Sequence, residues 1–355
     1  MKRNVLAMLL LAAMMLSFAV CGGTASAEEP ETVTIQSVNA AGEIVDLEVP
    51  YDPQRIAILD LACLDILDNL GLGDRVVGTT TTSIDYLAKY ADNADIMNLG
   101  NVKTADMEAV MGCEPDIIFA GGRLTSVYDE LSEIAPTVLL TTDAELGVLE
   151  STRRNALTIA SIFGLEDEIS EKFDGFAERL DTLKEAAGAQ TCVLSMVTGG
   201  SFNFLGNDGR LSLIVNEIGF ENIGANAAGS GNQGGHGENG GHSGNGGEGH
   251  DHSGSAENHG KDSAVTTPHG EETSFELVTK LNPAYIFVLD RDMAIGTDGA
   301  QLAADLLDNE LVNDTDAAKN GHVVIFDDPA VWYTAEGGIT ALDQMITDME
   351  AVLLG

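Results

Sequence analysis

The sequence predicts an α/β protein of two similar lobes with mostly parallel sheets, joined by a single long helix, with a ligand cleft between the lobes. Short apolar strands alternate with helical segments, and this order favours parallel sheets because the helices form the crossovers between parallel strands. A pattern of Glu, Pro and Arg occurs twice at one constant spacing, which indicates a duplicated lobe. A long amphipathic segment lies between the two copies.

The first α/β lobe is predicted over residues 32–164. Thr32–Val49 alternates apolar and polar residues, which predicts β structure, and Arg55–Leu59 is typical of a buried strand. Leu64–Leu70 has the pattern of a helix, and a further strand begins within Asp74–Gly78. Strand and helix therefore alternate from the start of this lobe.

Residues 165–188 predict the connecting helix. Gly188 ends the run, and a helix of about 22 residues would be about 33 Å long. A new strand begins at Thr191, so a second α/β lobe is predicted over residues 189–355. The apolar residues at helical spacing in the connecting segment are Ile169, Phe173, Phe176, Leu180 and Leu183.

The repeated pattern places an arginine at the end of one strand in each lobe. A short helix, a proline turn and an apolar strand precede the arginine in both copies. Open α/β sheets bind ligands at the carboxyl ends of their strands, so both arginines are predicted to face one cleft. The two glutamates are predicted to begin helices, where a carboxylate suits the helix dipole. The matched residues, 168 positions apart, are Glu108 and Glu276, Pro115 and Pro283, and Arg123 and Arg291.

The N-terminal segment predicts export. Basic residues precede an apolar run over Val5–Val20, which is typical of a signal peptide. Two processing sites compete: Cys21 follows a lipobox-like stretch and would carry a lipid after removal of residues 1–20, whereas Ala25-Ser26-Ala27 suits ordinary cleavage after residue 27. The small-residue tether after Cys21 favours the lipoprotein, anchored on the outer face of the cytoplasmic membrane. Ordinary cleavage would give a periplasmic or secreted protein.

Three further cysteines, Cys63, Cys113 and Cys192, are too few for a disulfide framework. Buried apolar thiols are the favoured interpretation, and a Cys63–Cys113 bridge is the alternative.

Residues 229–260 predict a disordered insertion in the second lobe. The segment holds 13 of the 40 glycines and no Val, Ile, Leu, Met or aromatic residue, so it has no apolar area to bury. Imidazoles among carboxylates suit Zn²⁺ or a similar metal, and an inert tether is the equal alternative. The histidines of this possible accessory metal loop are His236, His242, His250, His252 and His259.

The charge balance argues against nucleic acid as a partner. There are 57 Asp and Glu against 17 Lys and Arg, a net charge of −40, whereas nucleic-acid-binding domains carry a basic surface. The mean field also repels anionic small ligands unless a few arginines gather in one cleft.

The chain resembles the helical-backbone solute-binding proteins of bacterial ABC importers, which serve iron–siderophores, cobalamin and haem. The resemblance is strongest to the ferric catecholate siderophore-binding lipoproteins and covers the mature chain outside 229–260. The stretches that carry it are Leu281–Arg291 (LNPAYIFVLDR), Asp328–Tyr333 (DPAVWY) and Gly121-Gly-Arg123.

The resemblance implies roles for particular residues. Three arginines would bind the anionic ferric siderophore, a tyrosine and a histidine would complete the iron coordination, and Glu108 and Glu276 would dock on the permease. Fe³⁺ is a hard cation that prefers oxygen ligands, and guanidinium groups keep their protons, so the residue types fit. His259 is a second choice for the histidine. The matching residues are Arg123, Arg210 and Arg291 for the ligand, and Tyr333 and His269 for the metal.

The predicted function is therefore an extracytoplasmic, monomeric receptor that delivers a ferric siderophore to an ABC permease. An enzyme is not expected, because the hydrolase, nucleotide-binding and zinc-protease motifs that we sought are absent from the sequence. The alternatives are a receptor for cobalamin or haem and a zinc scavenger that uses the His-rich segment; a hydrolase is a distant third.

Overall fold

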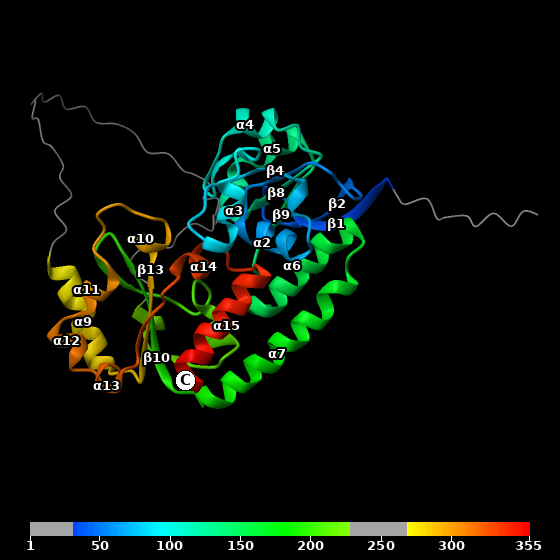
Figure 1. The fold of residues 1–355 in the computed structure, drawn as a ribbon. Helices are drawn as coiled ribbons and strands as arrows, with labels where there is room; N and C mark the ends of the chain where they lie inside the picture. The colour runs from blue at the N-terminus through cyan, green and yellow to red at the C-terminus, as the bar shows by residue number, and fades with distance from the viewer. Residues whose placement is uncertain (1–30, 228–267) are drawn as a thin grey trace, which may run out of the picture.

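The structure is a computed structural model that describes residues 31–227 and 268–355. Two α/β lobes, each built on its own sheet, are connected through one long helix (Figure 1), which confirms the predicted fold class. The predicted signal segment, Cys21 and the His-rich segment 229–260 lie outside the described residues.

The first lobe contains a five-stranded sheet in which all neighbours are parallel. The central strands are buried along their whole length, as expected for a parallel sheet with both faces covered. In spatial order the strands are β5 (Met97–Asn98), β4 (Val76–Thr79), β3 (Ile56–Ile58), β8 (Ile117–Gly121) and β9 (Thr137–Leu140).

Two small hairpins accompany this sheet. The alternating segment predicted over Thr32–Val49 folds as an antiparallel pair, β1 (Thr32–Val38) and β2 (Ile44–Pro50). A second pair is formed by β6 (Gly100–Asn101) and β7 (Thr104–Ala105).

The second lobe contains a sheet that is parallel except at one edge. Strand β10 pairs in parallel with β12 and β13, β13 pairs in parallel with β14, and β11 returns antiparallel to β10. The strands are β10 (Thr191–Thr198), β11 (Ser201–Phe204), β12 (Glu221–Asn222), β13 (Tyr285–Asp290) and β14 (Val323–Ile325).

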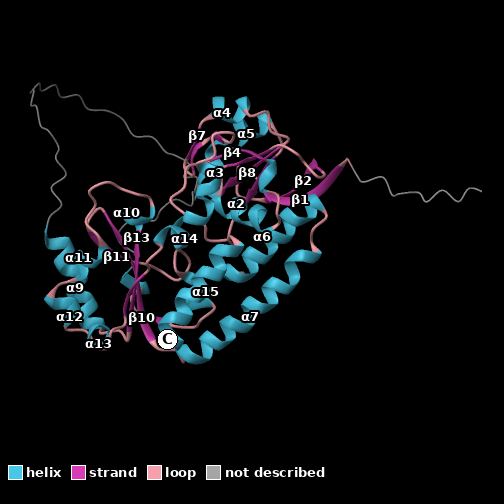
Figure 2. Ribbon diagram, in the orientation of Figure 1, coloured by secondary structure: helices cyan, strands magenta, loops and turns pink. Residues whose placement is uncertain are grey.

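Helices cover both sheets (Figure 2). In the first lobe they are α2 (Leu61–Asn69), α3 (Ala88–Ala91), α4 (Met107–Gly112), α5 (Tyr128–Ile134) and α6 (Gly147–Phe163), and in the second lobe α8 (Ser212–Asn216), α9 (Pro268–Leu281), α10 (Arg291–Ala294), α11 (Ala303–Leu307), α12 (Glu310–Asn313), α13 (Asp316–Lys319) and α14 (Pro329–Thr334).

Two long helices run between the lobes. Helix α7 (Asp167–Ala187) is the predicted connector, and its five apolar residues at helical spacing are all buried. The last helix, α15 (Ile339–Leu354), follows the second lobe in sequence but packs along α7 and α2 (Figure 1). Arg179 of α7 pairs with Asp343 and Glu350 of α15. The apolar core consequently continues from one lobe into the other.

The repeated pattern folds alike in both lobes. Helix α4 leads through a turn to β8 and then Arg123, and helix α9 leads to β13 and then Arg291. Glu108 lies in the first turn of α4, as predicted. The prediction for Glu276 is wrong, because α9 begins at Pro268 and places Glu276 well inside the helix.

The three cysteines within the described residues are free and buried, so the Cys63–Cys113 bridge does not form. Cys63 and Cys113 belong to different apolar clusters, on the two sides of the first sheet's strands. Burial raises the pKa of each of the three thiols, which keeps them protonated and unreactive.

Candidate functional site

Tyr333 lies at the boundary between the lobes, on the short helix α14. Pro329 begins this helix, where the absent N–H is not needed. Trp332 is fully buried, stacks on Phe326 at 4.2 Å between ring centroids, and donates its indole N–H to Asp348 at 2.8 Å. Neighbouring residues on a helix point in different directions, so this anchor leaves the Tyr333 ring half-buried on another face.

Three arginines surround the Tyr333 ring. The guanidinium carbons of Arg123, Arg210 and Arg291 lie 5.6, 5.1 and 5.8 Å from its centroid. All three distances fall within the range of cation–π attraction, about 6 Å. The structure therefore brings together four of the five residues that the resemblance implied for ligand and metal binding, although 210 positions separate the first from the last of the four.

Each arginine comes from a different structural element. Arg123 lies in the short 3₁₀ helix Gly122–Val127 that follows β8 in the first lobe. Arg291 begins α10 directly after β13, and Arg210 lies in the turn before α8. The next residue, Leu211, has a positive φ of 67°, which turns the chain sharply into α8. Two of the arginines thus occupy the carboxyl ends of parallel strands, as predicted.

Hydrogen bonds fix the cluster across the lobe boundary. Nε of Arg291 donates to the Tyr333 hydroxyl at 3.1 Å, and its Nη1 donates to Thr198 Oγ1 at 3.1 Å. From the other lobe, Nη2 of Arg123 donates to the Tyr333 carbonyl at 3.1 Å. A second bond across the boundary joins Ser83 Oγ to the Ala294 carbonyl at 2.8 Å.

The charged side chains of the cluster shift the pKa values of their neighbours. Burial and the neighbouring charge of Arg210 lower the pKa of Arg123. Burial acts to raise the pKa of Tyr333, but the hydrogen bond and charge of Arg291, with the charges of Lys103 and Arg123, lower it below its ordinary value. The Tyr333 phenol therefore loses its proton more readily than an ordinary tyrosine does.

Carboxylates that the sequence reasoning missed accompany the arginines. Asp292 lies 3.3 Å from Arg291 Nη1, and Glu336 lies 3.4 Å from Arg210 Nη1. Asp60 interacts with the charge of Arg123. The sequence suggested that the arginines alone dominate the local field, but each has an acidic neighbour. Only adjacency in the chain, as in Asp290-Arg291-Asp292, gave a signal of this.

The two predicted docking glutamates stand on surface helices of the two lobes. Glu108 and Glu276 are both exposed, one on α4 and one on α9. His269 is in the first turn of α9, and its side chain is outside the described part, as are the histidines of 229–260. Within 31–227 and 268–355, no group of three or more His, Cys, Asp or Glu side chains is arranged to hold a metal ion.

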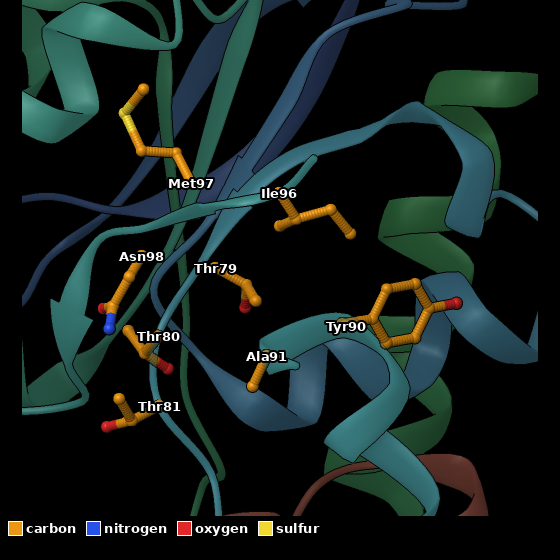
Figure 3. Close-up of a pocket in the computed structure, with 8 residues that line it drawn as sticks. All are labelled: Thr79, Thr80, Thr81, Tyr90, Ala91, Ile96, Met97 and Asn98. Carbon is orange, nitrogen blue, oxygen red and sulfur yellow. The ribbon is translucent and has the colours of Figure 1, made fainter. Parts of the chain in front are cut away.

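Two cavities lie away from the arginine cluster. One has a volume of about 10 Å³ and is lined by Thr79, Thr80 and neighbouring residues of the first lobe (Figure 3). The hydroxyls of Thr79 and Thr80 are buried without a protein partner, and the space suits one water molecule. The other, of about 520 Å³, is an open groove along α6 and β1 beside Arg153 and Arg154.

No helix in the described part of the chain is long and apolar enough to cross a membrane.

Comparison with known proteins identifies the class of protein to which this chain belongs. The chain belongs to the periplasmic binding protein family, whose family model matches residues 56–239. Proteins of this family serve ABC importers outside the cytoplasm, which sets the coarse location of the chain.

Several relatives share most of their length with this chain. The petrobactin-binding protein YclQ of Bacillus subtilis (strain 168) is 29% identical over 304 residues, which cover 85% of this chain and 83% of the relative. The ferric-anguibactin-binding protein FatB of Vibrio anguillarum is 24% identical over 303 residues, covering 84% and 81%. Sequence similarity therefore extends through both lobes.

Solved structures show the same fold. The YclQ crystal structure superposes with a TM-score of 0.72 at 26% identity, covering 92% of this chain and all of that one. The periplasmic catecholate-siderophore-binding protein VctP of Vibrio cholerae gives a TM-score of 0.69 at 26% identity, covering 90% and 100%.

Proposed function

We propose that this protein is the substrate-binding component of an ABC importer and that it binds a ferric siderophore of the catecholate type. The observation that carries the proposal is the convergence of Arg123, Arg210 and Arg291 on Tyr333 from both lobes. Relatives with similar coverage are named for petrobactin and ferric anguibactin, and VctP for catecholate siderophores.

The chemistry of the cluster supports an anionic ferric ligand. Guanidinium groups remain charged and present several donors in a fixed plane, which suits catecholate oxygens. A phenolate oxygen is a good ligand for Fe³⁺, so Tyr333 would complete the coordination of a complex whose siderophore supplies only four oxygens. His269 is proposed as a second protein ligand.

A fluorescence titration tests the ligand class. Trp332 is the single tryptophan and is fully buried, so quenching would arise by energy transfer to the ferric complex, without direct contact. We expect quenching by ferric catecholates, and weaker binding by about tenfold or more for Arg291→Gln, which loses a charge-assisted contact. Lys280→Gln, an exposed charge change on α9, is the matched control. Absence of quenching by every ferric catecholate tested would exclude this ligand class.

The two exposed glutamates are proposed to dock on the permease. Glu108 and Glu276 stand on corresponding helices of the two lobes, which gives one contact from each lobe. Replacing both by Ala should abolish uptake by cells while ferric-siderophore binding to the isolated protein stays within twofold. Loss of binding as well would contradict a docking role.

Membrane attachment and oligomeric state complete the proposal. We propose a monomer held at the outer face of the cytoplasmic membrane by a lipid on Cys21. Replacing Cys21 by Ser should release the protein from the membrane fraction.

The His-rich segment is proposed as an accessory metal loop that the ferric ligand does not need. Deleting residues 229–260 should leave ferric-siderophore affinity unchanged and remove Zn²⁺ binding. If all useful metal affinity disappears with the segment, the protein is a zinc scavenger instead.

A further inference from the structure

Glu336 is a buried carboxylate beside the arginine cluster. It lies between α14 and α15, three residues after Tyr333, and its side chain is only 7% exposed. Its Oε1 accepts a hydrogen bond from Nη1 of Arg210 at 3.4 Å. A carboxylate this deeply buried needs a positive partner, and Arg210 supplies it.

The other two carboxylates of the cluster have structural duties that Glu336 lacks. Asp60 Oδ1 accepts the amide of Cys63 at 3.0 Å and so caps α2, and Asp292 Oδ2 accepts the amide of Gly199. Glu336 has Arg210 as its sole hydrogen-bond partner among the described residues. It can therefore change its partner or its charge without uncapping a helix.

Burial and the neighbouring arginines act on the pKa of Glu336 in opposite directions. Burial raises its pKa, and the charges of Arg210 and Arg123 lower it only in part. The charge of Glu336 in turn helps to raise the pKa of Glu217, the residue after α8, to about 7, although burial contributes more. Because the Arg210 charge is one of the causes that lower this pKa, loss of that partner would raise it further.

We propose that Glu336 is the resident counter-ion of Arg210, and that its negative charge limits, in a pH-dependent way, the preference of the site for anionic over neutral ligands. The inference rests on the proposed function, because it concerns the ligand of that same site. An anionic ferric complex takes Arg210 as its own partner and leaves the carboxylate buried beside a negative charge. Glu336 then binds one proton from solvent for each anionic ligand bound, and a neutral ligand causes no such uptake.

The uptake of this proton determines how the affinity for an anionic ferric complex changes with pH. Because the liganded state holds one more proton, affinity for an anionic complex rises as pH falls, within the interval between the Glu336 pKa values of the free and liganded protein. The affinity for a neutral complex does not change over the same interval.

Isothermal titration calorimetry in buffers of different ionisation enthalpy tests the proposal. The probes are an anionic ferric tris-catecholate and a neutral ferric trihydroxamate of similar size, at pH 6, 7 and 8. Wild type should take up a proton with the catecholate alone. Glu336→Gln should lose this uptake and bind the catecholate about tenfold tighter at pH 8, since one like charge is gone. Binding of the trihydroxamate should stay within twofold.

Two further variants distinguish an effect of the Glu336 charge from a general effect of substitution on the structure. Glu336→Asp retains the carboxylate and should retain proton uptake, whereas Asp46→Asn, an exposed charge change on β2, should behave as wild type. The proposal is overturned if Glu336→Gln still takes up the proton, weakens catecholate binding, or changes the affinity of both ligands equally.

A measurement without ligand keeps the two proposals apart. Infrared difference spectra of the free protein along an acid titration should contain a carboxylic-acid carbonyl component that Glu336→Gln removes, in addition to the component expected from Glu217. If wild type binds neither ferric complex, the proposed function fails, and this band alone decides the role of Glu336. An unchanged band in the variant would overturn it.

Discussion

Asp65 holds the beginning of the last helix of the chain, because its Oδ1 accepts the amide hydrogen of Thr340 at 2.9 Å. Its Oδ2 accepts the amide of Ala341 at 2.9 Å and the hydroxyl of Tyr86 at 2.8 Å. Asp65 belongs to α2 of the first lobe, while α15 follows the second lobe. A carboxylate suits the N-terminus of a helix, so this contact ties the two halves of the chain together.

The second lobe makes a similar contact with a helix of the first lobe. The Oε1 of Glu217, just after α8, accepts the amides of Val148 and of Leu149, the latter at 3.3 Å, in the first turn of α6. Thus Asp65 of the first lobe caps α15, the helix that follows the second lobe, and Glu217 of the second lobe caps α6, a helix of the first lobe. The two caps differ, because both oxygens of Asp65 have donors whereas Oε2 of Glu217 is buried without one.

Asp65→Asn should destabilise the protein by about 3 kcal/mol, because charged hydrogen bonds to two amides are lost and the new amide group opposes an N–H donor. Denaturant unfolding at pH 7 measures the change. Asp46→Asn, exposed on β2, should change the free energy of unfolding by less than about 0.5 kcal/mol. Equal effects of the two substitutions would show that the cap contributes nothing specific.

Glu217 should make stability depend on pH near neutrality. Burial raises its pKa to about 7 from 4.5, although the hydrogen bonds from Leu149 and Val148 act to lower it. Because the folded state binds the proton more tightly, the stabilisation is complete below about pH 4.5 and is lost as pH rises through 7.

The comparison of wild type with Glu217→Gln isolates this group. The free energy of unfolding of wild type, relative to the variant, should fall by about 2 kcal/mol between pH 5 and pH 8. Denaturant unfolding at several pH values gives the difference curve. A flat curve would mean that Glu217 has an ordinary pKa in the folded protein.

Much of this arrangement could be predicted from the sequence, because it depends on local patterns. The apolar spacing predicted α7, and the 168-residue offset placed Arg123 and Arg291 at equivalent strand ends. The alternating segment over Thr32–Val49 did not show its turn, so one β segment was predicted where a hairpin forms. Such a turn depends on local hydrogen bonds around Asn39 and Gly42, which apolar periodicity does not reveal.

Contacts between segments that are far apart in the sequence could not be predicted from sequence patterns. The path of α15 across the lobe boundary depends on Asp65, 274 positions before Ile339, and nothing in either segment identifies the partner. The same applies to Glu336 and Arg210, whose pairing is a product of tertiary packing. The arginines were found through a resemblance and a repeat, whereas their counter-ions belong to neither.

Gly147→Ala should be more destabilising than an ordinary substitution at positive φ. Gly147 has φ +80°, and an added Cβ would lie 2.6 Å from Oε1 of Glu217, so the cap would have to move. Gly296 has φ +66° with open space around it, so Gly296→Ala reports backbone strain alone, about 1 kcal/mol. Gly147→Ala should cost about 1–3 kcal/mol more in denaturant unfolding. Equal costs would contradict close packing of Glu217.

Tyr333→Phe should separate ferric ligands by the number of oxygens that they supply. A siderophore with four donor oxygens leaves two iron positions for the protein, so loss of the phenolate should weaken its binding by about tenfold or more. A siderophore with six donor oxygens should lose less than about threefold, because it keeps the cation–π surface of the ring. Fluorescence titrations give both affinities. Equal losses would assign Tyr333 to packing.

Arg291→Gln should raise the pKa of Tyr333. In the wild type, burial acts to raise this pKa, and the hydrogen bond from Arg291 Nε together with the Arg291 charge overcomes it. Glutamine keeps a polar side chain but loses the charge, so only Lys103 and Arg123 remain to oppose burial and the phenolate should form at higher pH than in the wild type. Phenolate absorbance during an alkaline titration, with the curve of the corresponding Tyr333→Phe protein subtracted, isolates this residue. Lys280→Gln, exposed on α9, should leave the midpoint where it is in the wild type. A midpoint that does not move in Arg291→Gln would show that the Arg291 guanidinium does not lower the pKa of Tyr333.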